Sequence, residues 1–592
     1  MKSLLIYLKN YKKEAVLAPL FKMLEATFEL IVPLVMAAVI DVGIGNGDRT
    51  YVIHMCLVLI LLGIVGLASS ITAQYFAAKA ATGFATELRH AFFAHVQQLS
   101  FAQMDTIGTD TLITRMTSDI NQAQSGVNMV LRLFLRSPFI VLGAMIMAFT
   151  VDVKAAMVFV VTIPLLSVIV FGIMMITMPM YKKVQSYLDQ VLQTTRENLT
   201  GARVIRAFHR EDREREQFES RNEQLASAQK FVGRISGLMN PLTYVTINFA
   251  IIVLIYVGAL RVNSGALTQG AVVALLNYMS QILVELIKLA NLIVTVTRAA
   301  ASGNRVADVM AIEPDMKEEA EQVQGTDAGA AQTCSTADTV SGQPALVEFD
   351  HVCLTYPGGG DPALQDISFA AYPGQTIGII GGTGSGKSSL VNLIPRFYDV
   401  TEGSVRVHGQ DVRTQSMNGL RSRIGMVFQK SELFKGSIEE NLRWGNQAAT
   451  QQDLEDALLA SQAKEFVDSK PGRLSFRIEQ SGRNLSGGQK QRLTIARALV
   501  RKPEVLILDD SASALDFATD ARLRMAIRQM HHQMTIFIVS QRAASIREAD
   551  RILVLDEGRL AGSGTHEELL RENAVYQEIY YSQFPKEEDH AE

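Results

Sequence analysis

The chain of 592 residues predicts a multi-domain membrane protein, in which a six-helix α-helical transmembrane domain precedes an α/β domain with a phosphate-binding loop. Three observations predict this fold class. The first half contains six long apolar runs, and each is long enough to cross a bilayer as a helix. The second half alternates apolar strand-like runs with helix-like segments, as α/β domains do. Residues 381–388 match the spacing of a phosphate loop and stand between a strand-like and a helix-like run.

Composition excludes several classes of protein. The formal net charge of −4 is small, so no nucleic-acid role follows from it. The three cysteines, Cys56, Cys334 and Cys353, lie far apart and lack the spacing of zinc ligands. We therefore expect reduced thiols, without a disulfide framework or a metal site. The N-terminus is rich in Lys and lacks the short apolar core of a cleavable signal peptide.

The first 302 residues predict the membrane half. Residues 1–15 are basic and amphipathic, which indicates an elbow helix on the membrane surface. The transmembrane domain then covers 16–302. A buried helix of a soluble protein is the alternative for one apolar run, but the recurrence of long runs disfavours it. The six candidate spans lie near 16–41, 53–77, 136–153, 155–180, 236–261 and 269–298.

Lys and Arg are concentrated in two segments, one after the second span and one after the fourth. The positive-inside rule places both segments and both termini in the cytoplasm, so we expect a multi-pass protein of the bacterial inner membrane. Each segment has roughly 55–60 residues with few Gly or Pro, which is too long for a structureless loop. We therefore expect membrane helices that continue far into the cytoplasm and turn back.

The two turning points carry apolar side chains on what should be cytoplasmic tips. The first, at 101–109, begins with Phe101 and turns at Gly108; the second, at 201–208, is apolar and basic and ends at Phe208. A solvated turn is the alternative at each point. Because exposed apolar side chains need a place to be buried, we expect a short helix at each tip that docks on the C-terminal domain.

Residues 303–345 separate the two halves, and 324–345 have the composition of a flexible linker. The α/β domain is expected over 346–582, and a polar tail follows at 583–592. Its strands are predicted from short apolar runs that suit a largely parallel, buried sheet. These runs are 347–356, 404–409, 424–428, 505–508, 535–539 and 552–555.

The loop at 381–388 has the residue types that phosphate binding needs. Glycines let backbone N–H groups curl around phosphate oxygens, and the following helix presents its positive end to the same anion. Lys387 supplies a positive charge for the outer phosphates, and Ser388 a hydroxyl ligand for Mg²⁺. A chance match in a glycine-rich turn is the alternative, which the flanking strand and helix disfavour.

Two further stretches fit the same chemistry. The buried strand 505–508 is followed by Asp509 and Asp510, and an Asp at such a strand end holds Mg²⁺ directly or through water. The turn at 484–489, Asn-Leu-Ser-Gly-Gly-Gln, precedes a helix-like run that starts at Lys490. It therefore offers a second anion-binding helix start.

The order of these motifs resembles the nucleotide-binding domain of ABC transporters. The motifs are the phosphate loop, Gln429 after a strand, Leu-Ser-Gly-Gly-Gln at 485–489, the strand ending in Asp509, and Ser-Ala-Leu-Asp at 513–516. With six preceding spans, the chain is similar to a half-transporter of the ABC exporter type, with the type IV fold. The resemblance covers residues 10–580.

The resemblance implies ATP and Mg²⁺ as cofactors and assigns roles to matching residues. Tyr356 is expected to stack on adenine. Gln429 is expected to reach Mg²⁺ and the attacking water, and Asp509 to serve the metal together with Ser388. The phosphates are expected to be held by Gly381, Gly382, Thr383, Gly384, Ser385, Gly386, Lys387, Ser388 and Ser389.

The resemblance also implies a dimer, because one chain holds one phosphate loop and one Leu-Ser-Gly-Gly-Gln stretch. In the family, Ser486, Gly488 and Gln489 would bind the γ-phosphate of an ATP that the other subunit holds. Asp516 would lie at the dimer interface. Two chains would thus enclose two ATP molecules head to tail.

Two catalytic positions depart from the family's usual pattern. The family usually has Glu after the strand-end Asp, as the base that polarises water, and here the residue is Asp510, one methylene shorter. It usually has His at the last switch position, and here Gln541 can hydrogen-bond to a γ-phosphate but cannot carry a positive charge. Because a carboxylate misplaced by about 1 Å costs on the order of 10²-fold in rate, we expect a site that binds ATP and hydrolyses it slowly. Tolerated variation is the alternative, since Asp keeps a charge and Gln a donor.

This pattern resembles the degenerate-site subunit of a bacterial heterodimeric multidrug exporter. The Leu-Ser-Gly-Gly-Gln stretch is intact, so the chain would lend a good signature to the active site of a partner. The hypothesis is a heterodimer with a second half-transporter that carries the Glu and the His.

Four ionisable residues lie within the predicted spans, where such groups usually face a cavity or one another. Glu25 and Glu29 share one face of the first span, and Glu285 and Lys288 lie on the sixth. One interpretation is a polar wall for cationic amphiphiles. The other is a Glu285–Lys288 pair at helical spacing, or helix ends outside the lipid. The many Met residues suit an adaptable apolar surface but are more often plain packing.

The function predicted from the sequence is ATP-driven export of hydrophobic or amphiphilic compounds. A dedicated lipid or peptide exporter is a second hypothesis, although no peptidase-like domain precedes the first span. A third is a regulatory half that mainly binds ATP and gates its partner. The motifs do not give the cargo, and import by a similar architecture stays an alternative. The membrane half excludes a soluble ATPase.

Overall fold

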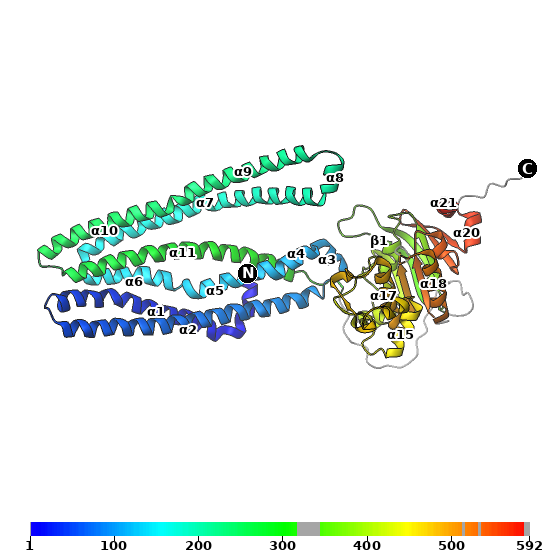
Figure 1. Cartoon of the computed structure of the whole chain (residues 1–592), viewed down its shortest axis with the longest axis horizontal. Helices are drawn as coiled ribbons and strands as arrows, with labels where there is room; N and C mark the ends of the chain where they lie inside the picture. Colours follow the sequence, from blue (N-terminus) through cyan, green and yellow to red (C-terminus); the bar gives the residue numbers. More distant parts are fainter. Residues whose placement is uncertain (1, 317–343, 512–514, 531–533, 585–592) are drawn as a thin grey trace, which may run out of the picture. The chain divides into compact units, whose positions relative to one another are not determined.

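The computed structural model describes residues 2–316, 344–511, 515–530 and 534–584 (Figure 1). It divides into two compact units. The helical unit comprises Met1–Gln97 and Asp110–Glu313, and the α/β unit comprises Gln98–Thr109 and Pro314–Glu592. Most of the predicted linker and of the predicted C-terminal tail lies outside the described residues.

The helical unit consists of six long helical segments in the described part of the chain, each long and apolar enough to cross a membrane. They are Ser3–Ile44, Arg49–Val96, Thr109–Val151, Val153–Thr200, Glu211–Asn263 and Gln269–Met310, which confirms the predicted six-helix class. The elements are η1 (Lys2–Tyr11), α1 (Lys12–Ala38), η2 (Val39–Ile44), α2 (Arg49–Val96), α4 (Thr109–Thr114), η3 (Arg115–Asp119), α5 (Ile120–Leu133), α6 (Arg136–Val151), α7 (Val153–Thr200), α8 (Ala202–Ala207), α9 (Glu211–Gly237), α10 (Met239–Asn263) and α11 (Gln269–Met310).

Several helices are much longer than a bilayer requires. Helices α2 and α7 have 48 residues each. At 1.5 Å per residue each spans about 72 Å, against about 30 Å of hydrocarbon. Helices α7 and α9 run side by side as one long arm that turns at α8 (Figure 1). The predicted continuation of membrane helices into long paired extensions is therefore present.

Small side chains let the helices of this unit approach closely. On α2, Ala73, Ala77 and Ala80 are fully buried at intervals of about one turn, on the face toward α1 and α5. Where α5 crosses α11, a Cβ on Gly126 would lie 2.2 Å from the Cβ of Ala299. A larger residue than Gly at 126 would therefore push these two helices apart.

The α/β unit is built around a six-stranded sheet in the order β12-β11-β3-β10-β9-β6, with a four-stranded antiparallel sheet in the order β2-β1-β4-β5 beside it. Strands β11, β3, β10, β9 and β6 are parallel, and β12 is antiparallel to β11. The strands are β1 (Val347–Leu354), β2 (Leu364–Ala371), β3 (Thr376–Gly381), β4 (Glu402–Val407), β5 (Gln410–Asp411), β6 (Ile424–Val427), β7 (Gly436–Ser437), β8 (Arg477–Ile478), β9 (Val505–Asp509), β10 (Thr535–Val539), β11 (Arg551–Asp556) and β12 (Arg559–Gly564).

Helices cover the parallel sheet, and each of the six strand-like runs predicted from the sequence corresponds to one of these strands. Strands β3 and β9 are buried at every position, as the apolar runs indicate. The helices of the unit are α3 (Phe101–Ile107), α12 (Lys387–Leu393), α13 (Met417–Ser422), α14 (Ile438–Arg443), α15 (Gln451–Ala460), α16 (Lys464–Asp468), η4 (Arg473–Ser475), η5 (Gln480–Gly482), α17 (Gly487–Val500), α18 (Phe517–Met530), α19 (Ala543–Ile546), α20 (His566–Glu572) and α21 (Ala574–Gln583).

Both predicted tip helices are present, as α3 and α8. Helix α3 belongs to the α/β unit, where the ring of Phe101 lies 4.7 Å from that of Phe397. This confirms the predicted docking of the first tip. At the second tip Val204 and Phe208 are 60% and 72% exposed, and docking of α8 stays a prediction.

Candidate functional site

The candidate site lies where three neighbouring parallel strands end. Strand β10 pairs with β3 on one side and with β9 on the other, and Val539 is opposite both Ile379 and Asp509. Because parallel strands share the direction of their carboxyl ends, the loops that follow β3, β9 and β10 meet at one edge of the sheet. This register brings together residues that are far apart in the sequence.

A cavity of about 380 Å³ opens at this edge, and we call it the phosphate-loop cavity. Most of the residues predicted to bind ATP and Mg²⁺ line it. Of the predicted phosphate ligands, Gly381, Gly382 and Ser385 belong to the same loop without lining the cavity. The lining residues are Tyr356, Ala363, Thr383, Gly384, Gly386, Lys387, Ser388, Ser389, Gln429, Asp509, Asp510, Val539, Ser540 and Gln541.

The glycine loop itself is shaped by backbone that only glycine adopts easily. Gly384 and Gly386 have φ of +85° and +91°, and a Cβ on Gly386 would lie 2.7 Å from the carbonyl oxygen of Ala363. The Lys387 ammonium donates to the carbonyl oxygens of Gly381 at 3.0 Å and Gly382 at 2.5 Å. Burial lowers the pKa of Lys387, so an arriving anion would stabilise its charged form.

The two residues predicted to serve the metal are in direct contact. The Ser388 hydroxyl donates to Asp509 Oδ1 at 3.0 Å. Burial raises the pKa of Asp509. Hydroxyl and carboxylate oxygens are ligands that Mg²⁺ accepts, and Mg²⁺ is commonly held by one or two carboxylates together with substrate phosphates. The donor set therefore fits Mg²⁺ bound jointly with a nucleotide.

The two departing residues lie in the same cavity. Asp510 has a left-handed backbone with φ of 44°, and its N–H donates to the carbonyl oxygen of Val539 at 3.0 Å. Its Oδ2 accepts from Gln429 Nε2 at 3.4 Å, and burial raises its pKa. Gln541 also lines the cavity and follows β10. The cavity thus offers a carboxylate and two amides to a terminal phosphate.

The Leu-Ser-Gly-Gly-Gln turn does not line this cavity. It starts α17, where Ser486 Oγ accepts from the N–H of Gln489 at 3.3 Å and Gln489 Oε1 accepts from the N–H of Ser486 at 3.1 Å. Ser486 is exposed, and Gly488 is half-buried. Asp516 Oδ2 accepts from the N–H of Thr519 at 3.0 Å. Residues 513 and 514 of the predicted motif lie outside the described residues.

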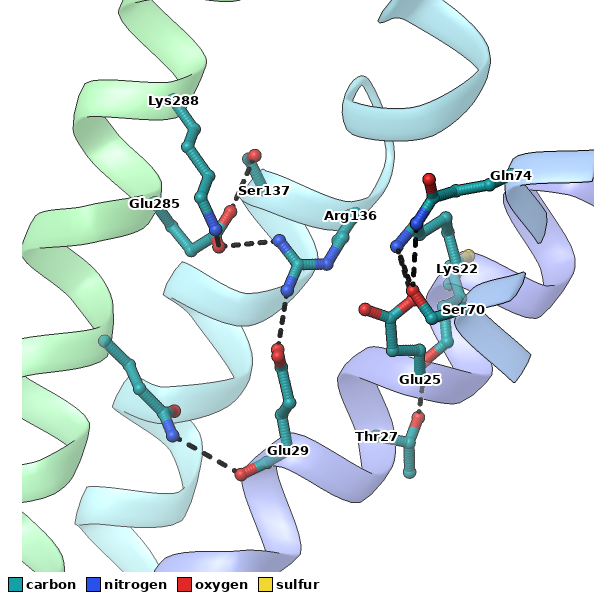
Figure 2. Close-up of polar contacts among 12 residues, drawn as sticks. Lys22, Glu25, Thr27, Glu29, Ser70, Gln74, Arg136, Ser137, Glu285 and Lys288 are labelled. Carbon is teal, nitrogen blue, oxygen red and sulfur yellow. Dashed lines mark hydrogen bonds and ion pairs between the residues drawn. The ribbon is translucent and has the colours of Figure 1, made fainter. Parts of the chain in front are cut away.

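A second polar site lies inside the helical unit, where charged side chains from three helices meet (Figure 2). The Arg136 guanidinium on α6 stands between Glu285 on α11 and Glu29 on α1 (Figure 2). Its Nη1 donates to Glu285 Oε1 and its Nη2 to Glu29 Oε2, both at 2.7 Å. Glu285 also accepts from Lys288 Nζ at 2.8 Å and from Ser137 Oγ at 2.8 Å.

Beside it, Glu25 forms an ion pair with Lys22 on the same helix, and Lys22 donates to Ser70 Oγ on α2 at 3.1 Å (Figure 2). Side-chain exposure differs sharply within the whole set. The carboxylates of Glu285 and Glu25 are 4% and 13% exposed, whereas Glu29 is 46% exposed. Glu29 is therefore the carboxylate of this set that remains most open.

Sequence reasoning identified the acidic members of this cluster and Lys288 but missed Arg136 and Lys22. The predicted Glu285–Lys288 pair is present, and the polar wall stays a prediction. Arg136 stands at the start of an apolar run, next to segments whose charges are cytoplasmic, so its position in the sequence indicates a helix end. A signal was nevertheless present in the sequence. Glu25, Glu29 and Glu285 are three carboxylates within the spans, and Lys288 alone cannot neutralise them, so further cations were to be expected nearby.

Two parts of the chain match known families. Residues 16–286 match the family described as ABC transporter transmembrane region, and residues 364–513 match the family described as ABC transporter. The first match covers five of the predicted spans and part of the sixth, and the second runs from β2 through β9 and includes the phosphate loop.

Whole-length relatives have the same two-part organisation. The chain is 36% identical over 587 residues to an uncharacterized ABC transporter ATP-binding protein, YfiB, of Bacillus subtilis, with 99% of each chain covered. It is 30% identical to a putative multidrug export ATP-binding/permease protein, YgaD, of the same organism, with 98% of each covered. It is also 30% identical to the ATP-dependent lipid A-core flippase of Desulfotalea psychrophila, with 84% of each covered.

Among solved structures, a bacterial Atm1-family ABC exporter with ATP bound has the same fold. The superposition gives a TM-score of 0.76 and covers 98% of this chain and 99% of the other, at 23% sequence identity. The exporter fold therefore extends over the whole chain.

Proposed function

This chain belongs to the ABC transporters, and we propose that it forms one half of a bacterial exporter that moves hydrophobic or amphiphilic compounds across the inner membrane. Its exporter fold and ABC ATPase domain make ATP-driven transport the family activity. We further propose that both termini are cytoplasmic, which the concentration of Lys and Arg in the two long extensions supports.

The observation that carries the proposal is the content of the phosphate-loop cavity. It combines a loop shaped for phosphates, the contacting pair Ser388 and Asp509, and the lining residue Tyr356. We assign Tyr356 to the adenine, Lys387 to the outer phosphates, and Ser388, Gln429 and Asp509 to Mg²⁺. Mg²⁺ would neutralise charge on the phosphates.

We propose that this chain's own site hydrolyses ATP slowly. Asp510 takes the place of the longer Glu, and its carboxylate already accepts from Gln429. Gln541, in place of His, contributes a hydrogen bond and no charge. Because the Leu-Ser-Gly-Gly-Gln turn is complete and lies away from this cavity, it would serve ATP held by a partner. The proposed assembly is therefore a heterodimer with a half-transporter that carries Glu and His.

For the cargo, we propose amphiphilic cations, with Glu29 as the residue that meets their charge. Glu29 is the most exposed carboxylate of the membrane cluster, and its side chain is held by Arg136. Glu25 is nearly buried and neutralised by Lys22 on the same helix. A cationic head group would replace Arg136 at Glu29 more easily than Lys22 at Glu25.

Inside-out membrane vesicles that contain the chain with its native partner test this proposal, with ATP-dependent uptake of a cationic dye and of a neutral dye as readouts. Glu29→Gln should lower uptake of the cationic dye by roughly tenfold, the effect of removing one charge-assisted contact, and leave neutral dye and ATP hydrolysis unchanged. Glu25→Gln is the matched control. Unchanged cationic uptake in Glu29→Gln would refute the assignment.

A lipid is the second candidate cargo, because one relative that is 30% identical is named a lipid A-core flippase. In the same vesicles, ATP-dependent movement of a fluorescent phospholipid between leaflets, without uptake of either dye, would favour this function.

A further inference from the structure

Tyr398 lies between the docked helix α3 and the predicted adenine-stacking residue Tyr356. Its ring centroid is 5.1 Å from that of Tyr356, and the two ring planes meet at 88°, which is an edge-to-face contact. Its hydroxyl donates to Asp105 Oδ2 on α3 at 2.7 Å. One side chain therefore contacts both the base platform and the helix that continues from α2.

Helix α3 is anchored on this surface by aromatic packing as well. The ring of Phe101 lies 4.7 Å from that of Phe397 and 6.4 Å from that of Tyr398. Phe397 in turn stacks on Phe428 at 5.8 Å, next to Gln429 of the cavity. The aromatic contacts hold α3 in place, while the Asp105–Tyr398 bond links it to the base side of the cavity.

Tyr356 is held from two directions. Its hydroxyl donates to Ser389 Oγ on α12 at 3.0 Å, and its ring meets Tyr398. Burial raises the pKa of Tyr398, and the hydrogen bond to Asp105 raises it further, so its hydroxyl stays a donor at neutral pH. A base that stacks on Tyr356 must settle against a ring whose orientation Tyr398 helps to set.

We propose that Tyr398, held by Asp105, is a positioning residue that orients Tyr356 for the nucleotide base and carries base occupancy to α3. The proposal rests on the ATP-binding function of the cavity. Phosphates would contact the glycine loop and Lys387, and Ser389 at the end of that loop accepts from the Tyr356 hydroxyl. A base would stack on the ring of Tyr356, and this ring is the part that Tyr398 contacts. Occupancy of the base position, rather than of the phosphate position, is therefore what α3 would sense.

Amide hydrogen exchange of the full chain in lipid nanodiscs tests this, because it reports the opening of α3 directly. The two ligands are Mg²⁺–ATP and Mg²⁺–tripolyphosphate, which fills the phosphate loop and has no base. In the wild type, ATP should slow exchange at 101–107 by about 2- to 10-fold, the range that one ordinary hydrogen bond gives, and tripolyphosphate should not.

Tyr398→Phe removes the hydroxyl and keeps the ring, so it should abolish the effect of ATP on α3 while ATP still binds. Asp105→Asn keeps an acceptor oxygen and should retain the effect, whereas Asp105→Ala should lose it without disturbing the Tyr398 ring. Tyr580→Phe, on α21 of the same unit, is the matched loss of a tyrosine hydroxyl and should behave as the wild type.

Two results would overturn the proposal. One is equal slowing of α3 exchange by tripolyphosphate and ATP, and the other is an undiminished ATP effect in Asp105→Ala or Tyr398→Phe. Failure of the ATP-binding function is a separate result, in which ATP does not bind to the wild type at all. If Tyr398→Phe does not fold, Asp105→Ala tests the same hydrogen bond.

Discussion

Restoring the usual family residues in the phosphate-loop cavity should accelerate hydrolysis. The Asp510 carboxylate is one methylene short, and adding a bond of about 1.5 Å moves it further into the cavity from β9. Asp510 now accepts from Gln429 Nε2 at 3.4 Å, which is a long hydrogen bond that the added methylene would change. A misplacement of about 1 Å costs on the order of 10²-fold in rate, or about 2.7 kcal/mol.

We therefore expect Asp510→Glu with Gln541→His to raise kcat of the purified chain by about 10- to 100-fold, with ATP affinity nearly unchanged because the phosphate loop is untouched. The assay is release of phosphate from Mg²⁺–ATP by the chain in nanodiscs, with ATP binding measured on the same samples. Lys387→Ala in the double variant is the control, because any phosphate release that remains in it comes from a contaminating ATPase and can be subtracted. A wild-type rate that already equals that of the double variant would refute the reasoning.

Two further predictions follow from burial and charge. Arg136→Met should lower the free energy of unfolding of the helical unit by about 1.5–3 kcal/mol, because the buried carboxylate of Glu285 loses the guanidinium and keeps Lys288 as its cation. Arg215→Gln, in an exposed pair on α9, should cost under about 1 kcal/mol. Thermal unfolding in lipid measures both, and equal losses would contradict the account. Burial raises the pKa of Asp509, so its carboxyl takes up a proton at a higher pH than an ordinary Asp. Because the carboxylate is the form that binds Mg²⁺, the gain in ATP affinity from Mg²⁺ should shrink as the pH falls through that raised pKa. Titration of ATP binding with and without Mg²⁺ measures this gain, and Asp509→Asn should lose its pH dependence; a gain that is constant with pH in the wild type would be contrary to the assignment.

The parts of the fold that follow local rules were predictable from the sequence. Apolar runs of bilayer length give helical spans, and short apolar runs ending in Gly or Asp give buried parallel strands. The phosphate loop and the strand ending in Asp509 are contiguous motifs, so the loop chemistry could be assigned before their distances were known. The residue types and spacing of such motifs can be interpreted from the local sequence alone, without knowing which distant residues pack against them.

The contacts that the sequence did not predict join residues far apart in the chain. The Tyr398 hydroxyl meets Asp105 across 293 positions, and Arg136 meets Glu285 across 149. Neither pair has a local pattern, because each depends on how helices and sheets pack. At Glu285 the pair with Lys288 at helical spacing was predicted and is present, whereas the contacts from Arg136 and Ser137 on α6 were not predicted.

The asymmetry of the proposed exporter is tested most directly by isolating the tagged chain from its native membrane, identifying what accompanies it, and measuring Mg²⁺–ATP hydrolysis with and without that companion. We predict an equal amount of a second half-transporter that carries Glu and His at the positions matching Asp510 and Gln541, with turnover that depends on it. Full turnover by this chain alone would contradict the account, since Asp510 and Gln541 would then suffice in a homodimer.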